Sequence, residues 1–171
     1  MQALRGNRIS MIFQEPSTAL NPLLTIGEQI SEVLIRHKNR SKADAWKETI
    51  SLLRSVGIPN PEQRAKEYPH QFSGGMQQRA MIAMAMSCKP DLLIADEPTT
   101  ALDVTVQAQV LEQLNKLRQE ADTALIIITH NLGVVARYAD SVKIMYGGKI
   151  VEEGDTFQIF ENPHQDRKSV V

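Results

Sequence analysis

Short apolar runs alternate along the chain with longer segments in which apolar positions recur at helical spacing. The runs ISMIFQ, LLIA and ALIIIT each predict a buried strand, the first ending at Gln14 and the third at His130. Helical segments are expected at about residues 75–87 and 104–120, and SVKIMYGGKIVEEG predicts a hairpin that turns at two adjacent glycines. Strands that alternate with helices indicate a layered α/β core.

A helical insertion separates the first strand from the rest of this core. The segment TIGEQISEVLIRH has one apolar face, formed by Ile26, Ile30, Val33 and Leu34. The next segment, SKADAWKETISLLRSVG, begins with the N-cap residue Ser41, has Asp44 three positions later and stops at Gly57. We therefore predict helices across most of residues 25–68.

Composition removes several classes of protein. The 171 residues carry 19 basic and 20 acidic side chains, so no net field directs the chain to nucleic acid or to an anionic membrane. The single cysteine, Cys88, excludes an internal disulfide, and its apolar surroundings predict a buried, unreactive thiol. No apolar stretch approaches the roughly 20 residues of a membrane span, and no signal-peptide segment is visible, so we expect a cytosolic protein.

Two adjacent carboxylates, Asp96 and Glu97, follow the run LLIA directly. Ligands of parallel α/β sheets gather beyond the carboxyl ends of the strands, where one carboxylate can hold Mg²⁺ and the next can orient a nucleophilic water. The alternative is that both acids are solvated loop residues. The sequence PTTALD that follows them favours the first interpretation.

Three further features each have two interpretations. Ser73, followed by Gly74 and Gly75, is either an ordinary N-cap or part of an anion site made of backbone N–H groups at the positive end of a helix. His130 is either a structural residue or a group that hydrogen-bonds a terminal phosphate. Gln14 is either merely exposed or a ligand of Mg²⁺ or of the attacking water.

The order and spacing of these motifs strongly resemble the ABC-type ATPase family over nearly the whole chain. The resemblance implies that Gln14 is the Q-loop glutamine and that residues 72–76 are the signature, in which Met76 stands where the family most often has glutamine. It also implies that residues 92–96 form the Walker B strand, with Asp96 helping to hold Mg²⁺. The implied fold is a partial P-loop NTPase core, α/β in class, with an inserted helical subdomain.

Further roles follow from the same resemblance. Glu97 would be the catalytic base, Asp103 would lie in the D-loop and His130 would be the switch histidine. The implied cofactors are ATP and Mg²⁺. The implied assembly is a head-to-tail dimer of ATP-binding subunits, in which the signature residues 73–76 of one subunit face the ATP of the other.

The stretches MIFQEPSTALNPLLTIGEQI, YPHQFSGGMQQRAMIAMA and LLIADEPTTALDVTVQAQ are similar to the dipeptide, oligopeptide and nickel importer branch of that family. This implies two transmembrane permease subunits, an extracytoplasmic solute-binding protein and a peripheral place on the cytoplasmic face of the membrane. The sequence does not distinguish importers of dipeptides, oligopeptides, nickel or glutathione. It is also compatible with either a homodimer or a heterodimer of ATP-binding subunits. The alternatives are a non-transport ABC ATPase and a non-catalytic module that completes a partner's ATP site; the charge balance predicts no nucleic-acid partner.

The phosphate-binding loop G-x-x-x-x-G-K-[ST] does not occur in the sequence. We therefore interpret the chain as the C-terminal part of a nucleotide-binding domain, inactive alone and with one apolar sheet face exposed. The expected division is 1–18 for a partial core strand and the Q-loop, 19–71 for the helical subdomain, 72–155 for the remaining core and 156–171 for a tail. Residues 166–171, DRKSVV, are either a divergent tail or read-through of a sequencing adapter that can encode this string.

Overall fold

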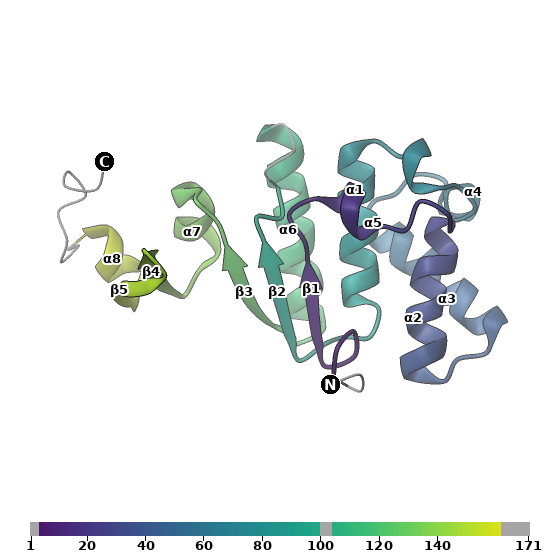
Figure 1. Ribbon diagram of the computed structural model, residues 1–171, viewed down its shortest axis with the longest axis horizontal. Helices are drawn as coiled ribbons and strands as arrows, with labels where there is room; N and C mark the ends of the chain where they lie inside the picture. The colour runs from purple at the N-terminus through teal and green to yellow at the C-terminus, as the bar shows by residue number, and fades with distance from the viewer. Residues whose placement is uncertain (1–3, 100–103, 162–171) are drawn as a thin grey trace. The chain divides into compact units, whose positions relative to one another are not determined.

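The computed structural model describes residues 4–99 and 104–161. The chain forms two compact units, residues 1–128 and residues 129–171, and Figure 1 shows the helices and strands of both. In the two described stretches, no helix combines the length and apolar composition that crossing a membrane requires.

Three parallel strands form the sheet of the first unit: β1 (Ile9–Ile12), β2 (Leu92–Asp96) and β3 (Ala124–Ile128), in the order β1-β2-β3 (Figure 1). Ile12 pairs with Ala95, and Ala95 pairs with Ile127. This register brings the carboxyl ends of all three strands to one edge of the sheet. The three apolar runs are confirmed as strands of one parallel sheet. The expected burial of the third is wrong, because no residue of β3 is buried and Ile126 and Ile128 are each 49% exposed.

Two of these strands end earlier than the sequence predicts. β1 ends at Ile12 rather than at Gln14, and β3 ends at Ile128 rather than at His130. The chain after β1 turns into a short helix that begins at Pro16, because proline fits the first turn of a helix but cannot donate to a ladder. Both polar residues therefore lie beyond the strands.

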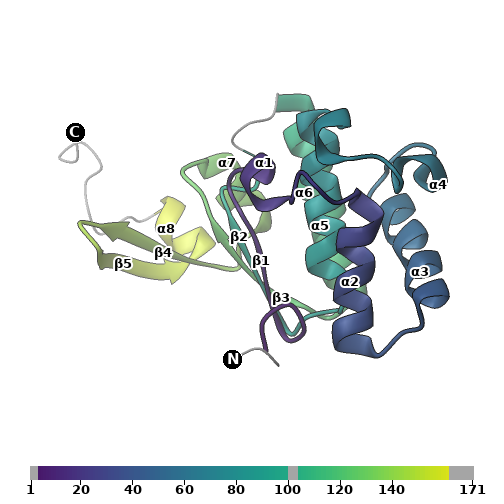
Figure 2. The same ribbon diagram turned by 45° about the vertical axis from the view of Figure 1, so that its right-hand side comes forward.

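Helices α5 (Gly74–Met86) and α6 (Val104–Glu120) cover one face of this sheet (Figure 2). The buried side chains between them include Ile12, Met81, Ile82, Leu93, Val110 and Leu114. Alternate residues point to the other face, where apolar side chains are 37 to 49% exposed: Ile9, Met11, Phe13, Ile126 and Ile128. The exposed apolar face expected from the sequence is therefore present.

The segment between β1 and α5 is helical, as the sequence predicts. It contains α1 (Pro16–Ala19), α2 (Ile26–Lys38), α3 (Lys42–Ser55), α4 (Pro61–Arg64) and the 3₁₀ helix η1 (Pro69–Gln71). Ser41 caps α3 by accepting a hydrogen bond from the Asp44 N–H at 3.1 Å, and Gly57 follows its end with a φ of 74°. α2 and α3 pack against each other and against α5. The sequence does not predict α1, α4 or η1, because a single turn carries no apolar periodicity.

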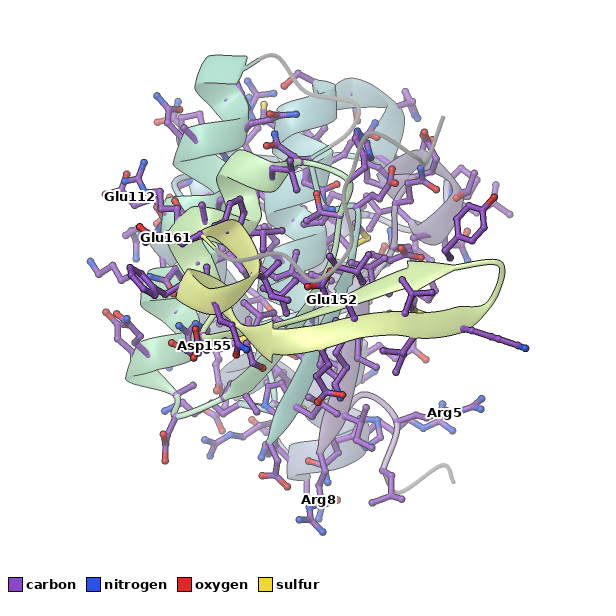
Figure 3. All side chains as sticks on the ribbon, turned by 90° about the vertical axis from the view of Figure 1, so that its left-hand side faces the viewer. Arg5, Arg8, Glu112, Glu152, Asp155 and Glu161 are labelled. Carbon is purple, nitrogen blue, oxygen red and sulfur yellow. The ribbon has the colours of Figure 1, made fainter. Side chains whose placement is uncertain are left out.

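The second unit contains α7 (Leu132–Tyr138), β4 (Ser141–Tyr146), β5 (Lys149–Asp155) and α8 (Thr156–Glu161). β4 and β5 form the predicted hairpin, which turns at Gly147 and Gly148 with φ values of 56° and 77°. A two-residue hairpin loop favours such positive φ values. At the end of β5, Asp155 (Figure 3) accepts a hydrogen bond from the Gln158 N–H at 2.7 Å and so caps α8.

Cys88 lies just after α5 and is 1% exposed, which confirms its predicted burial. Desolvation by burial raises the pKa of its thiol. A raised pKa lowers the thiolate fraction at neutral pH, and the thiolate is the reactive form. The structure thus gives a physical basis for expecting an unreactive thiol.

Candidate functional site

The parallel pairing of β1 and β2 brings Gln14 and Glu97 into direct contact. The side-chain amide of Gln14 donates a hydrogen bond to Oε2 of Glu97, with an N···O distance of 2.8 Å. The two residues are 83 positions apart in the sequence. Sequence reasoning singles out each of them at a strand end, but it cannot predict the bond between them.

The backbone of Glu97 has a conformation that is uncommon for a residue with a side chain. Its φ is 43°, in the left-handed region, where non-glycine residues are strained. The Glu97 N–H donates a hydrogen bond to the Ile128 carbonyl at 2.9 Å, and the buried residue Pro98 follows it. Strain of this kind persists where the surrounding structure fixes it, and it is concentrated at functional positions.

Asp96 is the last residue of β2 and is half-buried, opposite Ile128 of β3. The Gln14 amide nitrogen faces Glu97, so the amide oxygen is the atom of Gln14 that could coordinate a cation. In residues 4–99 and 104–161 there is no group of three or more histidine, cysteine or acidic residues suited to a metal. Mg²⁺ usually takes only one or two carboxylates and completes its shell with water and substrate phosphates, so Asp96 and Gln14 fit a site of this type.

The N-terminal end of α5 presents the second candidate, an anion site. Ser73 is the N-cap, and its hydroxyl accepts a hydrogen bond from the Met76 N–H at 3.3 Å. Neither Gly74 nor Gly75 has a positive φ, so their backbone conformation does not require glycine. A Cβ on Gly74 would meet no other atom within 4 Å, so the surface beside this residue is open. Such amides lack partners within the helix and can bind an anion.

Gln77 is a residue of this region that sequence reasoning misses. Its side-chain amide donates to the Pro69 carbonyl at 2.8 Å and to the Phe72 carbonyl at 3.4 Å. These bonds fix the turn that precedes Ser73 and hence the direction in which α5 begins. The sequence offers little signal for this role, because a glutamine on a helix is usually a solvated residue.

Two candidates are outside the described part of the first unit. His130 belongs to the second unit, where it is exposed and immediately precedes Asn131. Asn131 is the N-cap of α7 and accepts hydrogen bonds from the N–H groups of Gly133 and Val134. Asp103 and the tail 166–171 lie outside the described residues.

Comparison with known proteins gives consistent matches. Residues 1–100 match the protein family described as ABC transporter. The chain is 59% identical to the dipeptide transport ATP-binding protein DppD of Bacillus subtilis, over 95% of this chain and 49% of the relative. It is 55% identical to the oligopeptide transport ATP-binding protein OppD of Escherichia coli, over 95% of this chain and 48% of the relative. The chain thus spans about half the length of the curated relatives it matches.

Solved structures of ATP-binding cassettes resemble this one, and two of them illustrate the match. A dimeric post-hydrolysis state of the ATP-binding cassette MJ0796, bound to ADP and Pi, matches with a TM-score of 0.79 and 28% identity, over 91% of this chain and 66% of that chain. The cbiO1 protein from Clostridium perfringens, part of the ABC transporter complex cbiONQ, matches with a TM-score of 0.76 and 27% identity, over 90% of this chain and 59% of that chain.

Proposed function

Because the chain belongs to the ABC transporter family and has the α/β fold of its ATP-binding cassettes, we propose that it contributes to the ATP-binding subunit of an importer for peptides or a related solute. The hydrogen bond from Gln14 to Glu97 is the observation that supports this function most directly. It places an amide that leads into the helical insertion on a carboxylate suited to act as a base. In this pair, Glu97 would act on the nucleotide and Gln14 would respond to movement of the insertion.

Three residues at the carboxyl edge of the sheet would act on the nucleotide. When bound, ATP supplies the phosphoryl group, and Mg²⁺ neutralises the charge that develops on its oxygens. Asp96 would hold Mg²⁺ together with the amide oxygen of Gln14. Glu97 would accept a hydrogen bond from the attacking water and orient it, which is general-base catalysis.

His130 and the signature residues complete the proposed site. His130 would donate a hydrogen bond to the terminal phosphate. In a head-to-tail dimer, the amides of Ser73, Gly74 and Gly75 would stabilise the phosphate bound by the partner subunit. The open surface beside Gly74 is compatible with this role, because a phosphate must approach the backbone closely. Met76 and Asp103 would line the same dimer interface.

The helical insertion offers a surface suited to the transmembrane subunits. Leu23, between α1 and α2, is 82% exposed. The amide of Gln29, only 7% exposed, orders this loop by donating to the carbonyls of Asn21 and Leu24 at 3.0 Å each. A surface hollow adjoins the loop and is lined in part by Ala19, Val33 and Met84. The partner proposed for this loop and the adjoining hollow is the permease pair at the cytoplasmic face of the membrane.

Peptide transport is the narrower part of the proposal. It is supported by relatives that are 54 to 59% identical and are named for the transport or import of dipeptides, oligopeptides or peptides. An extracytoplasmic solute-binding protein would deliver the solute to the permeases. The residues that contact solute would belong to those partners.

Reconstitution in proteoliposomes tests this function. The native protein means here the complete ATP-binding subunit to which this chain is proposed to contribute. When it is assembled with its permeases and solute-binding protein, it should take up a labelled peptide only with ATP, and peptide should raise its rate of ATP hydrolysis. Hydrolysis that responds neither to the permeases nor to peptide would contradict the importer assignment. The 171-residue chain, whose sequence lacks the phosphate-binding loop, should show no steady hydrolysis alone. Activity should appear when the chain is mixed with a partner that has this loop but a disabled signature.

A further inference from the structure

The C-terminal end of α3 accepts hydrogen bonds from side chains of two other helices, α5 and α6. The Ile58 N–H donates to the Leu53 carbonyl at 3.0 Å, and the Gly57 N–H donates to the Arg54 carbonyl at 3.0 Å. This pair of bonds is a Schellman motif, a common end of an α-helix. The backbone carbonyls of Ser55, Val56 and Gly57 follow at this end of α3. Each accepts a hydrogen bond from a side chain of α5 or α6.

Arg79 of α5 makes most of these bonds. Its Nη1 donates to the carbonyl of Val56 at 3.2 Å and to that of Gly57 at 3.4 Å. Its Nη2 donates to Oε1 of Gln109 on α6 at 3.1 Å. One turn further along α6, the Gln113 amide donates to the Ser55 carbonyl. Two side chains thus fasten the end of α3 to α5 and α6, which lie next to each other (Figure 2).

Gly57 lies directly against this contact. Its φ of 74° favours glycine, and a Cβ at this position would also lie 2.6 Å from Nη1 of Arg79. A left-handed turn alone would tolerate asparagine. The end of the Arg79 side chain lies where a Cβ at residue 57 would be, so a substitution there would displace the guanidinium from its present position.

The arginine is suited to this place by its shape and its charge. A planar guanidinium can donate to acceptors in several fixed directions, which a lysine ammonium cannot reproduce. A cation also interacts favourably with the negative end of a helix dipole, here the carbonyl end of α3. Arg79 is half-buried, which reduces solvent screening of both effects.

Helix α6 carries the connection toward the carboxylate site. The Gln107 amide on α6 donates to the Thr99 carbonyl at 2.8 Å. Thr99 is buried and lies two residues after Glu97. The helix that accepts the third bond of Arg79 therefore also holds the segment that leaves Glu97.

We infer that Arg79 is a positioning residue that couples the placement of α3, in the helical insertion, to the placement of Glu97. It acts through Gln109 and α6 and does not itself contact the proposed nucleotide. The inference rests on the proposed function, because it assigns to Arg79 a part in transmitting movement between the insertion and the base. The bonds of Arg79 add a polar connection to the apolar packing that already joins α3, α5 and β1.

A nuclear magnetic resonance experiment on the full 171-residue chain tests the coupling without nucleotide. The variant Arg79→Lys keeps the charge but not the planar donor set, and Gln109→Leu removes only the contact to α6. Arg54→Lys is the matched control, because Arg54 lies at the same end of α3 but pairs with Glu62 instead. We expect both test variants, and not the control, to shift the side-chain amide resonances of Gln14. Unchanged Gln14 resonances in folded test variants would overturn the inference.

Hydrolysis by the native protein gives a second readout. Arg79→Lys should lower kcat by roughly tenfold while KM for ATP stays within about twofold, because the base is displaced and the phosphate contacts are not. Adding Gln109→Glu to Arg79→Lys should recover part of kcat by giving the ammonium a charged acceptor. The same kcat in all variants would overturn the inference about Arg79. It would also be overturned if kcat fell only in proportion to the folded fraction and Gln109→Glu restored none of it. Absence of hydrolysis in the unmodified native protein would instead contradict the proposed function, and the resonance experiment would still decide the role of Arg79.

Discussion

Gln14 donates a hydrogen bond of 2.8 Å to the carboxylate of Glu97 across the carboxyl ends of β1 and β2. Gln14 stands between β1 and α1, the first helix of the segment that joins β1 to α5. Glu97 has a left-handed φ of 43° and is tied to β3 through the Ile128 carbonyl. Movement of this segment would therefore act on Gln14, whereas the backbone of Glu97 is tied to the sheet through Ile128.

Replacing Gln14 tests the importance of this bond. Gln14→Leu keeps a similar size and removes the donor. The bond is exposed, so the free energy of unfolding should fall by no more than about 1 kcal/mol. Hydrolysis by the native protein should fall on the order of tenfold or more, because the base loses its orientation. Gln63→Leu, on the exposed surface of α4, is the control. Equal hydrolysis rates in the two variants would contradict the role given to Gln14.

Two N-cap serines allow the capping and anion-binding roles of Ser73 to be separated. Ser73 accepts a bond from the Met76 N–H, and Ser41 accepts one from the Asp44 N–H. Ser73→Ala and Ser41→Ala should each lower the free energy of unfolding by about 1 kcal/mol in chemical denaturation. Only Ser73→Ala should also slow hydrolysis by the native dimer. If Ser41→Ala slowed it to the same extent, the effect would be one of stability alone.

The packing of α2 on its neighbours depends on Gly27. A Cβ there would lie 2.6 Å from the Ala65 carbonyl oxygen and 2.6 Å from the Trp46 ring. Gly27→Ala should destabilise the chain by roughly 1–3 kcal/mol, since overpacking outweighs the helix propensity of alanine. Fluorescence of Trp46, the single tryptophan, should change as well. Gly74→Ala, where a Cβ meets nothing within 4 Å, should not lower stability.

Glu28 gives the helical insertion a defined pH dependence. Hydrogen bonds from the Thr25 backbone N–H, and then from the Thr25 hydroxyl, hold the pKa of the Glu28 carboxyl below its ordinary value of 4.5. A depressed folded-state pKa adds stability above the unfolded-state pKa, and this stability is lost as the pH falls through the folded-state pKa. When the pH is lowered from 7 to below 4.5, the free energy of unfolding measured with urea should therefore fall less in Glu28→Gln than in the unmodified chain. Glu32→Gln, on the same helix, controls for the loss of one carboxylate.

Local signals in the sequence predict much of this structure. The apolar runs predict β1, β2 and β3, and the caps Ser41 and Gly57 predict the limits of α3. Motif order predicts the family and the strand-end position of Glu97. The expected roles of the site residues and the division at residues 18, 71 and 155 stay predictions.

Features that depend on distant partners could not be predicted in this way. The Gln14–Glu97 bond joins residues 83 positions apart, and Arg79 reaches partners 23 and 30 positions away. The left-handed backbone of Glu97 is fixed by β3, and no residue in the run LLIADEP signals it. The contact made by Gly57 with the guanidinium likewise appears only once α3 and α5 are packed together.

The fate of ATP on a Glu97→Gln variant of the native protein tests the central proposal most directly. The substitution keeps the size of the side chain and removes the carboxylate that would orient the attacking water. Loss of a general base typically slows a reaction on the order of 10²–10⁴-fold, so the variant should bind ATP and retain it unhydrolysed in an assembled dimer. Release of phosphate at close to the normal rate would show that Glu97 is not the base.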